Sequence, residues 1–273
     1  GASPELVLAL SAALAPGDKV AFVRPGYVAY RNSLAALGRV AVEIAADAST
    51  GFQLCTDHLR ALDDDVKAVI LASPANPTGT MIAPDALQEI ADVARTRGIR
   101  IIADEIYHGL SYEAPAQTML AYEECAIILN SFSKYFAMPG WRLGWMVAPE
   151  DMVPLLRAYV GNLFLTPPTL SQQAALAAFE DEAVLQSYVQ SYARNRAALL
   201  AALPEMGITR IAPPDGAFYI WADVRHLTQD SMGFCMQLLE DTGIAIAPGI
   251  DFDPVEGNHF IRFSFAVREE ELQ

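Results

Sequence analysis

Hydrophobic positions alternate along this chain between two patterns. Short apolar runs rich in β-branched residues, typical of buried parallel strands, are separated by longer stretches with the 3.6-residue period of helices. No internal repeat or low-complexity segment interrupts this alternation. Strands are predicted over residues 19–23, 40–44, 68–72, 99–103, 126–129 and 143–147. The pattern therefore indicates an α/β fold whose mainly parallel sheet is flanked by helices.

Two of the predicted helices have recognisable ends. Residues 4–14 are preceded by Ser3, a candidate N-cap, and begin with a proline, which is tolerated at the first helical position. Residues 84–97 are followed by Gly98, which suits a left-handed C-cap.

The pattern changes after about residue 166. Two long helical stretches, residues 169–179 and 183–203, precede shorter strand candidates at 208–212, 217–221, 244–247 and 260–265. We expect a large domain over residues 1–168 and a smaller α+β domain over residues 169–273. A helical segment joins them, in place of a Gly/Ser linker.

Composition and charge exclude several classes of protein. With 53% hydrophobic and 19% charged residues, the chain lies far from the composition of disordered proteins. Its formal net charge of −15, without a basic patch, argues against a nucleic-acid partner. The apolar run 6–15 is too short to span a membrane, so no membrane partner is expected.

Cysteine and histidine usage points to neither a disulfide framework nor a metal centre. The three cysteines are scattered and form no CxxC pair, and the four histidines are isolated. No signal peptide opens the sequence, and no HExxH or GxSxG motif occurs. A reducing cytoplasm is the expected location, with no metal and no serine triad.

Polar clusters follow three of the predicted strands. They are Ser-Pro-Ala-Asn-Pro-Thr-Gly at 73–79, Asp-Glu-Ile-Tyr at 104–107 and Ser-Phe-Ser-Lys at 131–134. Ligands of parallel α/β sheets bind off the carboxyl ends of the strands. These clusters are therefore the candidate chemistry of the chain.

Lys134 is the candidate nucleophile. Lysine occurs only three times, and Lys19 and Lys67 lie in ordinary solvated settings beside turn residues or aspartates. Lys134 follows a strand and has aromatic neighbours at 132, 135 and 136. Desolvation there would favour the neutral, nucleophilic amine. From its position alone, a surface lysine at a strand end is an equal alternative.

The segment 131–144, SFSKYFAMPGWRLG, resembles the lysine-attachment signature of class I/II aminotransferases, the fold-type I enzymes that use pyridoxal 5′-phosphate (PLP). Further segments resemble this family in order and spacing, with 28 residues from Asn76 to Asp104 and 30 from Asp104 to Lys134. They are the phosphate loop at 1–3, the ring-stacking segment at 25–27, the asparagine loop at 76–79, the pyridine-binding strand end at 104–107 and the arginine strand at 260–265.

The resemblance implies a role for each matching residue. Lys134 would form an aldimine with PLP and then move the substrate proton, and Asp104 would keep the pyridine nitrogen protonated. Asn76 and Tyr107 would hydrogen-bond the phenolic oxygen, and Tyr27 would stack on the ring. The structural alternatives are a helix cap for the aspartate, a turn for the asparagine and core packing for the tyrosines.

Two further groups would bind anions. The phosphate would contact the amides of Ala2 and Ser3, the hydroxyls of Ser131 and Ser133 and the Arg142 guanidinium. Arg262 lies in an apolar strand and would bind the substrate α-carboxylate, with Asn76 beside it. Ion pairing within the protein is the alternative for both arginines.

The resemblance therefore implies a PLP-dependent aminotransferase, active as a homodimer, that transfers an amino group from an L-amino acid to a 2-oxo acid with ping-pong kinetics. Other interpretations stay open. A C–S β-lyase or an aminocyclopropane carboxylate synthase would use the same lysine. A non-catalytic sensing domain of a regulator, or a degenerate partner subunit, would share the fold.

Both ends of the sequence depart from the family pattern. Gly1 already lies in the segment that resembles the phosphate loop, and Gln273 falls within the expected last helix. We therefore expect the sequence to be a fragment of a longer enzyme, without the N-terminal arm that packs on the partner subunit.

Overall fold

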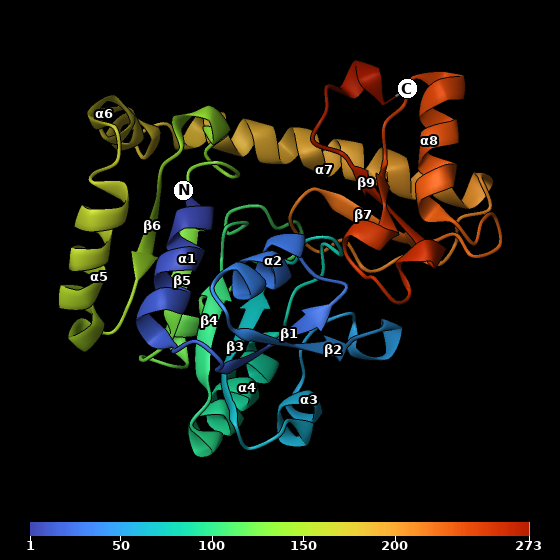
Figure 1. The fold of residues 1–273 in the computed structure, drawn as a ribbon. Helices are drawn as coiled ribbons and strands as arrows, with labels where there is room; N and C mark the ends of the chain where they lie inside the picture. The colour runs from blue at the N-terminus through green and yellow to red at the C-terminus, as the bar shows by residue number, and fades with distance from the viewer. Residues whose placement is uncertain (273) are drawn as a thin grey trace.

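A computed structural model describes residues 1–272 of the chain. It contains two sheets, one of six strands in the order β2-β1-β3-β4-β5-β6 and one of three strands in the order β7-β9-β8 (Figure 1). Strands β1 to β5 run parallel to one another, and β6 is antiparallel to β5. The fold is the mainly parallel α/β architecture that the hydrophobic pattern predicts.

The large sheet forms from the predicted apolar runs. Its strands are β1 (Lys19–Arg24), β2 (Val40–Ala45), β3 (Val66–Ala72), β4 (Arg100–Asp104), β5 (Ile127–Ser131) and β6 (Gly144–Val147). The helices that accompany it are α1 (Ala2–Ala13), α2 (Val28–Ala36), α3 (Thr56–Ala61), α4 (Pro84–Arg97) and α5 (Val153–Tyr159).

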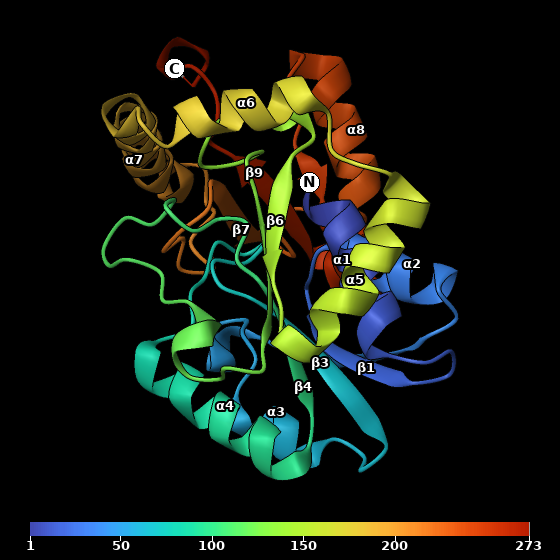
Figure 2. The same cartoon turned by 90° about the vertical axis from the view of Figure 1, so that its left-hand side faces the viewer.

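Helices cover both faces of this sheet, as Figure 2 shows. On one face α3 and α4 pack through Leu59, Leu87 and Ile90 against the strands. On the other face α1, α2 and α5 bury a second cluster that includes Leu10 and Leu34. A strand buried on both faces must be apolar at every position, which explains the continuous hydrophobic runs of the sequence.

The smaller unit follows the large sheet. Helix α6 (Thr169–Ala178) leads into the long α7 (Glu182–Glu205), which runs to the three-stranded sheet in Figure 1. That sheet consists of β7 (Tyr219–Asp223), β8 (Ala247–Pro248) and β9 (Phe260–Ser264), with α8 (Ser231–Thr242) packed beside it. The proposed domain boundary at 168/169 lies at the start of α6.

Three local predictions were wrong. Ser3 is not an N-cap, because α1 begins at Ala2 after Gly1. The amide hydrogens of the first helical turn have no acceptor within the helix. A proline is therefore tolerated at any position of that turn, and Pro4 does not mark the first helical residue. Residues 208–212 form no strand and contribute only the isolated bridge of Ile211 to Ala222, and of 244–247 only Ala247 pairs.

Other boundaries follow the sequence closely. Helix α4 spans Pro84–Arg97 and ends at Gly98, whose φ of 66° is left-handed. At the C-terminal end, Glu269–Glu271 form a short 3-10 turn. The expected interruption of a last helix at Gln273 lies outside the described residues.

Candidate active site

The three polar clusters meet because their strands are neighbours. Strands β3, β4 and β5 are adjacent and parallel, so their carboxyl ends share one edge of the sheet. A cavity of about 220 Å³ lies at this edge, enclosed also by α1, α2 and the small sheet. Eight of the predicted site residues line it: Ala2, Ser3, Tyr27, Asn76, Asp104, Tyr107, Lys134 and Arg262.

Asp104 is a buried carboxylate at the end of β4. It is 7% exposed, and its Oδ2 accepts a hydrogen bond of 2.6 Å from the Tyr30 hydroxyl. The Ile106 amide lies 3.3 Å from Oδ1. Burial raises the pKa of Asp104, while the Tyr30 hydrogen bond, the Ile106 amide and the charge of Lys134 lower it. The charged form of this carboxylate would therefore gain from a further cation in the cavity.

Lys134 extends its amine among aromatic rings. Its Nζ lies 5.7 Å from the Tyr107 ring centroid and 5.6 Å from that of Phe218. Desolvation lowers the pKa of Lys134, as do the positive charges of Arg262 and Arg142, and Asp104 partly opposes the shift. A lysine with a lowered pKa has a larger fraction of nucleophilic free amine at neutral pH.

A hydrogen-bonded group joins the large sheet to the small one. The Tyr107 and Tyr219 hydroxyls are 2.9 Å apart, and Arg262 Nη1 donates to Asn76 Oδ1 at 2.8 Å. The Arg262 guanidinium also packs 4.2 Å from the Tyr219 ring centroid and 4.6 Å from that of Phe252. Its Nε is buried and has no hydrogen-bond partner among residues 1–272.

Ser131, Ser133 and Arg142 lie beside the cavity and do not line it. The two serine hydroxyls are 2.7 Å apart, and Arg142 Nη1 donates to the Pro139 carbonyl at 2.8 Å. A Cβ at Gly1 would lie 3.1 Å from Arg142 Nη2, so glycine allows the guanidinium to approach the start of α1. First-turn amides of a helix lack intrahelical acceptors. This end of the site therefore offers several donors to an anion.

Sequence analysis missed two residues that contact the predicted ones. Tyr30 lies on α2 one helical turn after Tyr27, and their rings are 5.6 Å apart. Tyr219 begins β7 and is only 5% exposed. Nothing in the sequence around it indicates that it contacts the site. Both partners are distant along the chain, so only helical spacing from Tyr27 could have pointed to one of them.

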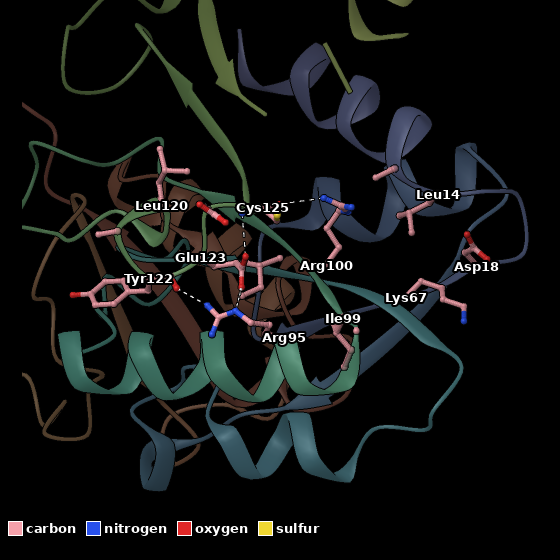
Figure 3. A pocket seen from close by; sticks show the side chains of 15 residues that line it. Leu14, Asp18, Lys67, Arg95, Ile99, Arg100, Leu120, Tyr122, Glu123 and Cys125 are labelled. Atoms are coloured by element: carbon pink, nitrogen blue, oxygen red, sulfur yellow. Dashed lines mark hydrogen bonds and ion pairs between the residues drawn. The ribbon is translucent and has the colours of Figure 1, made fainter. Parts of the chain in front are cut away.

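A larger hollow of about 900 Å³ lies at the opposite edge of the sheet (Figure 3). Its residues, among them Lys67, Arg100 and Cys125, precede or begin the strands, and none is a predicted site residue. Arg95 lies 3.0 Å from Glu123, and Arg100 donates to the Cys125 carbonyl. Hydrogen bonds within the protein thus already occupy these two guanidinium groups, and the chemistry concentrates at the other edge.

Comparison with known proteins identifies the family of the chain. The model of the family "Aminotransferase class I and II" matches residues 1–273. A valine–pyruvate aminotransferase of Mycobacterium tuberculosis is 48% identical over 97% of this chain and 70% of its own length.

Two solved structures share the fold. An aminotransferase from Mycobacterium tuberculosis has a TM-score of 0.97 and 46% identity, over the whole of this chain and 71% of its own. An aromatic aminotransferase from Pyrococcus horikoshii OT3 has a TM-score of 0.92 and 31% identity, over the whole chain and 74% of its own. The chain therefore belongs to the class I and II aminotransferases, the PLP-dependent fold-type I transaminases that move amino groups from amino acids to 2-oxo acids.

Proposed function

We propose that the chain binds PLP in the cavity at the carboxyl ends of β3, β4 and β5 and transfers an amino group from an L-amino acid to a 2-oxo acid there. One observation carries the proposal: a desolvated lysine amine, a buried carboxylate and an arginine with an unpartnered nitrogen line the same cavity. PLP supplies an aldehyde that joins to amines and a pyridine ring that accepts electrons.

The residues fit this cofactor. Asp104 is a buried carboxylate that a protonated pyridine nitrogen would complement. The start of α1, the two serine hydroxyls and Arg142 form a donor set that suits a phosphate. Arg262 Nε, buried without a partner among the described residues, suits a substrate carboxylate.

Each residue would then have a defined task. The Lys134 amine would hold the cofactor and would take up the proton from the substrate Cα. Asp104 would keep the ring nitrogen charged, and Tyr30 orients Asp104 through its hydroxyl. Tyr107 and Asn76 would donate hydrogen bonds to the cofactor's phenolic oxygen. Tyr27, the residue before α2, would pack against the ring.

The cavity favours a substrate with an apolar side chain. Arg262 would take the α-carboxylate, and Lys134 is the other cation among the cavity-lining residues. Leu6, Ile106 and Tyr219 supply much of the remaining wall. The valine–pyruvate relative supports the same choice. We therefore expect L-valine to be a better donor than L-aspartate.

We further propose a homodimer in the cytoplasm. Leu163 and Leu165, between α5 and α6, and Leu170, in the first turn of α6, are 60%, 78% and 72% exposed, and such apolar surfaces mark protein interfaces. No helix within residues 1–272 has the length and apolarity to cross a bilayer. Light scattering on the purified chain measures the oligomeric state.

The test of the proposed function combines cofactor capture with product analysis. The purified chain is mixed with PLP, its visible spectrum is recorded, and borohydride reduction with peptide mass mapping identifies the modified residue. L-valine and pyruvate should then give alanine and the 2-oxo acid of valine. A β-lyase would instead convert a cysteine S-conjugate and water to a thiol, pyruvate and ammonia, and a chain that captures no PLP would contradict the proposal.

Replacing Arg262 with leucine should raise KM for the amino donor. Removing one partner of a buried charge pair costs ~2–5 kcal/mol, so kcat/KM should fall by about 30- to 5000-fold. Arg262→Lys should recover part of this loss. It restores the positive charge, but an ammonium group lacks the two parallel N–H donors with which a guanidinium binds a carboxylate. PLP capture by Lys134 is the control, and an unchanged KM in Arg262→Leu would contradict carboxylate binding.

A further inference from the structure

Two ionisable residues beside the site, the buried Glu105 and the half-buried His108, have no task in the proposed reaction. Both residues lie in the turn after β4, where Glu105 directly follows Asp104 and His108 directly follows Tyr107. Glu105 is 5% exposed, and the His108 side chain is 19% exposed. Neither residue lines the cavity, so any influence on the reaction must pass through their neighbours.

His108 connects two strand ends. Its Nε2 lies 3.0 Å from the Ser73 carbonyl oxygen in the loop after β3. A carbonyl only accepts, so Nε2 must carry the hydrogen. The other ring nitrogen, Nδ1, lies 3.4 Å from Glu105 Oε2. A favourable contact there requires one shared proton, on either the carboxyl group or the ring.

Glu105 is itself fixed by a third segment. Its Oε1 accepts hydrogen bonds from the Met119 amide at 2.8 Å and the Thr118 hydroxyl at 2.9 Å. The Ser73 hydroxyl in turn accepts from the Ile82 amide at 2.9 Å. The pair therefore links the loop that leads to Asn76 with a carboxylate anchored at the end of β4.

We propose that Glu105 and His108 are positioning residues that hold the loop from Ser73 to Asn76 against Tyr107. This role rests on the proposed function, in which Asn76 and Tyr107 contact the same oxygen of PLP. Because Arg262 donates to Asn76 Oδ1, displacement of the loop would also disturb the carboxylate-binding arginine.

The shared proton makes this link pH-dependent. Burial raises the pKa of Glu105 to about 7, and Asp104 adds to the rise, while the Met119 and Thr118 hydrogen bonds oppose it. Burial lowers the pKa of His108. Asp104 faces Glu105 from β4, His108 faces it from the turn, and the segment at 118–119 contributes neutral donors. Above about pH 7 the proton is lost, and a carboxylate then faces the Nδ1 lone pair.

Matched variants separate this role from simple packing. Glu105→Gln keeps an acceptor for Thr118 and offers Nδ1 an amide hydrogen that does not titrate. His108→Leu removes both contacts, and His108→Gln restores a donor toward Ser73. PLP affinity is measured by fluorescence, and KM and kcat for L-valine with pyruvate are measured from pH 6 to 9.

Wild-type KM should rise by about 10-fold between pH 6.5 and 8.5, the effect of one weakened hydrogen bond. Glu105→Gln should keep the low KM and the tight PLP affinity across this range. His108→Leu should show the raised KM and weaker PLP binding already at pH 6.5, and His108→Gln should recover part of both.

Stability provides an independent measurement. The folded pKa of Glu105 lies above its ordinary value of 4.5, so its favourable contribution is full below about pH 4.5 and is lost as the pH rises to about 7. Glu105→Gln should therefore raise Tm more at pH 8 than at pH 5.

Two kinds of failure can be told apart. If the wild-type chain captures no PLP, the proposed function is wrong, and the positioning role is wrong with it. In the second kind of failure, the wild-type chain captures PLP, while Glu105→Gln and His108→Leu have the same KM, PLP affinity and pH profile as the wild type. In that case only the positioning role is wrong.

Discussion

Replacing Lys134 with alanine should lower the transamination rate by at least about 10²–10⁴-fold, the contribution of a positioned general base. The variant also loses the amine that would hold PLP, so borohydride reduction should leave no cofactor on the chain. A primary amine such as methylamine, added to the solution, should restore part of the activity, because it can take up the substrate proton. Single-turnover kinetics with L-valine measure the effect.

The chain contains its own control for this experiment. Lys67 lies far from the cavity at the start of β3, and Lys67→Ala should keep the wild-type rate and adduct. With three lysines in the sequence, peptide mapping assigns the adduct without ambiguity. An adduct on Lys19 or Lys67, or an active Lys134→Ala, would contradict the assignment of Lys134.

Replacing Asp104 with asparagine should lower kcat by about 10²–10³-fold, the range found when a preorganised electrostatic group is removed. The substitution keeps the size of the side chain and an oxygen for the Tyr30 hydroxyl, but it removes the negative charge that would keep the ring nitrogen protonated. Stopped-flow absorbance after mixing with L-valine measures the proton-transfer step.

Tyr30→Phe separates the charge of Asp104 from its orientation. The ring stays in its buried place, while the carboxylate loses its 2.6 Å hydrogen bond and its pKa rises further. A hydrogen bond to a charged group contributes ~1.5–3 kcal/mol, so kcat of Tyr30→Phe should fall by about 10- to 100-fold. Asp92→Asn, on the exposed face of α4, should have no effect. A kcat of Asp104→Asn within threefold of wild type would overturn the role of Asp104.

Sequence reasoning failed where local signals competed with chain connectivity. Residues 208–212 contain three β-branched side chains, which favour a strand, yet Pro213 and Pro214 follow them and cannot donate hydrogen bonds to a ladder. At 244–246 the chain connects the end of α8, at left-handed Gly243, to β8, and pairing with β9 begins only at Ala247.

The sequence alone determined the strands of the large sheet and the polar residues that follow them, because a strand buried on both faces requires a continuous apolar run and its carboxyl end faces the ligand. That is why Asp104 and Lys134 could be placed at the carboxyl edge of the sheet from their positions, whereas the roles expected of them came from the resemblance to the aminotransferase family. Only the tertiary structure decided which residues support them. Tyr30 meets Asp104 across 74 positions, Tyr219 meets Tyr107 across 112, and Arg262 meets Asn76 across 186. Such contacts depend on how helices and sheets pack, which periodicity along the chain does not encode.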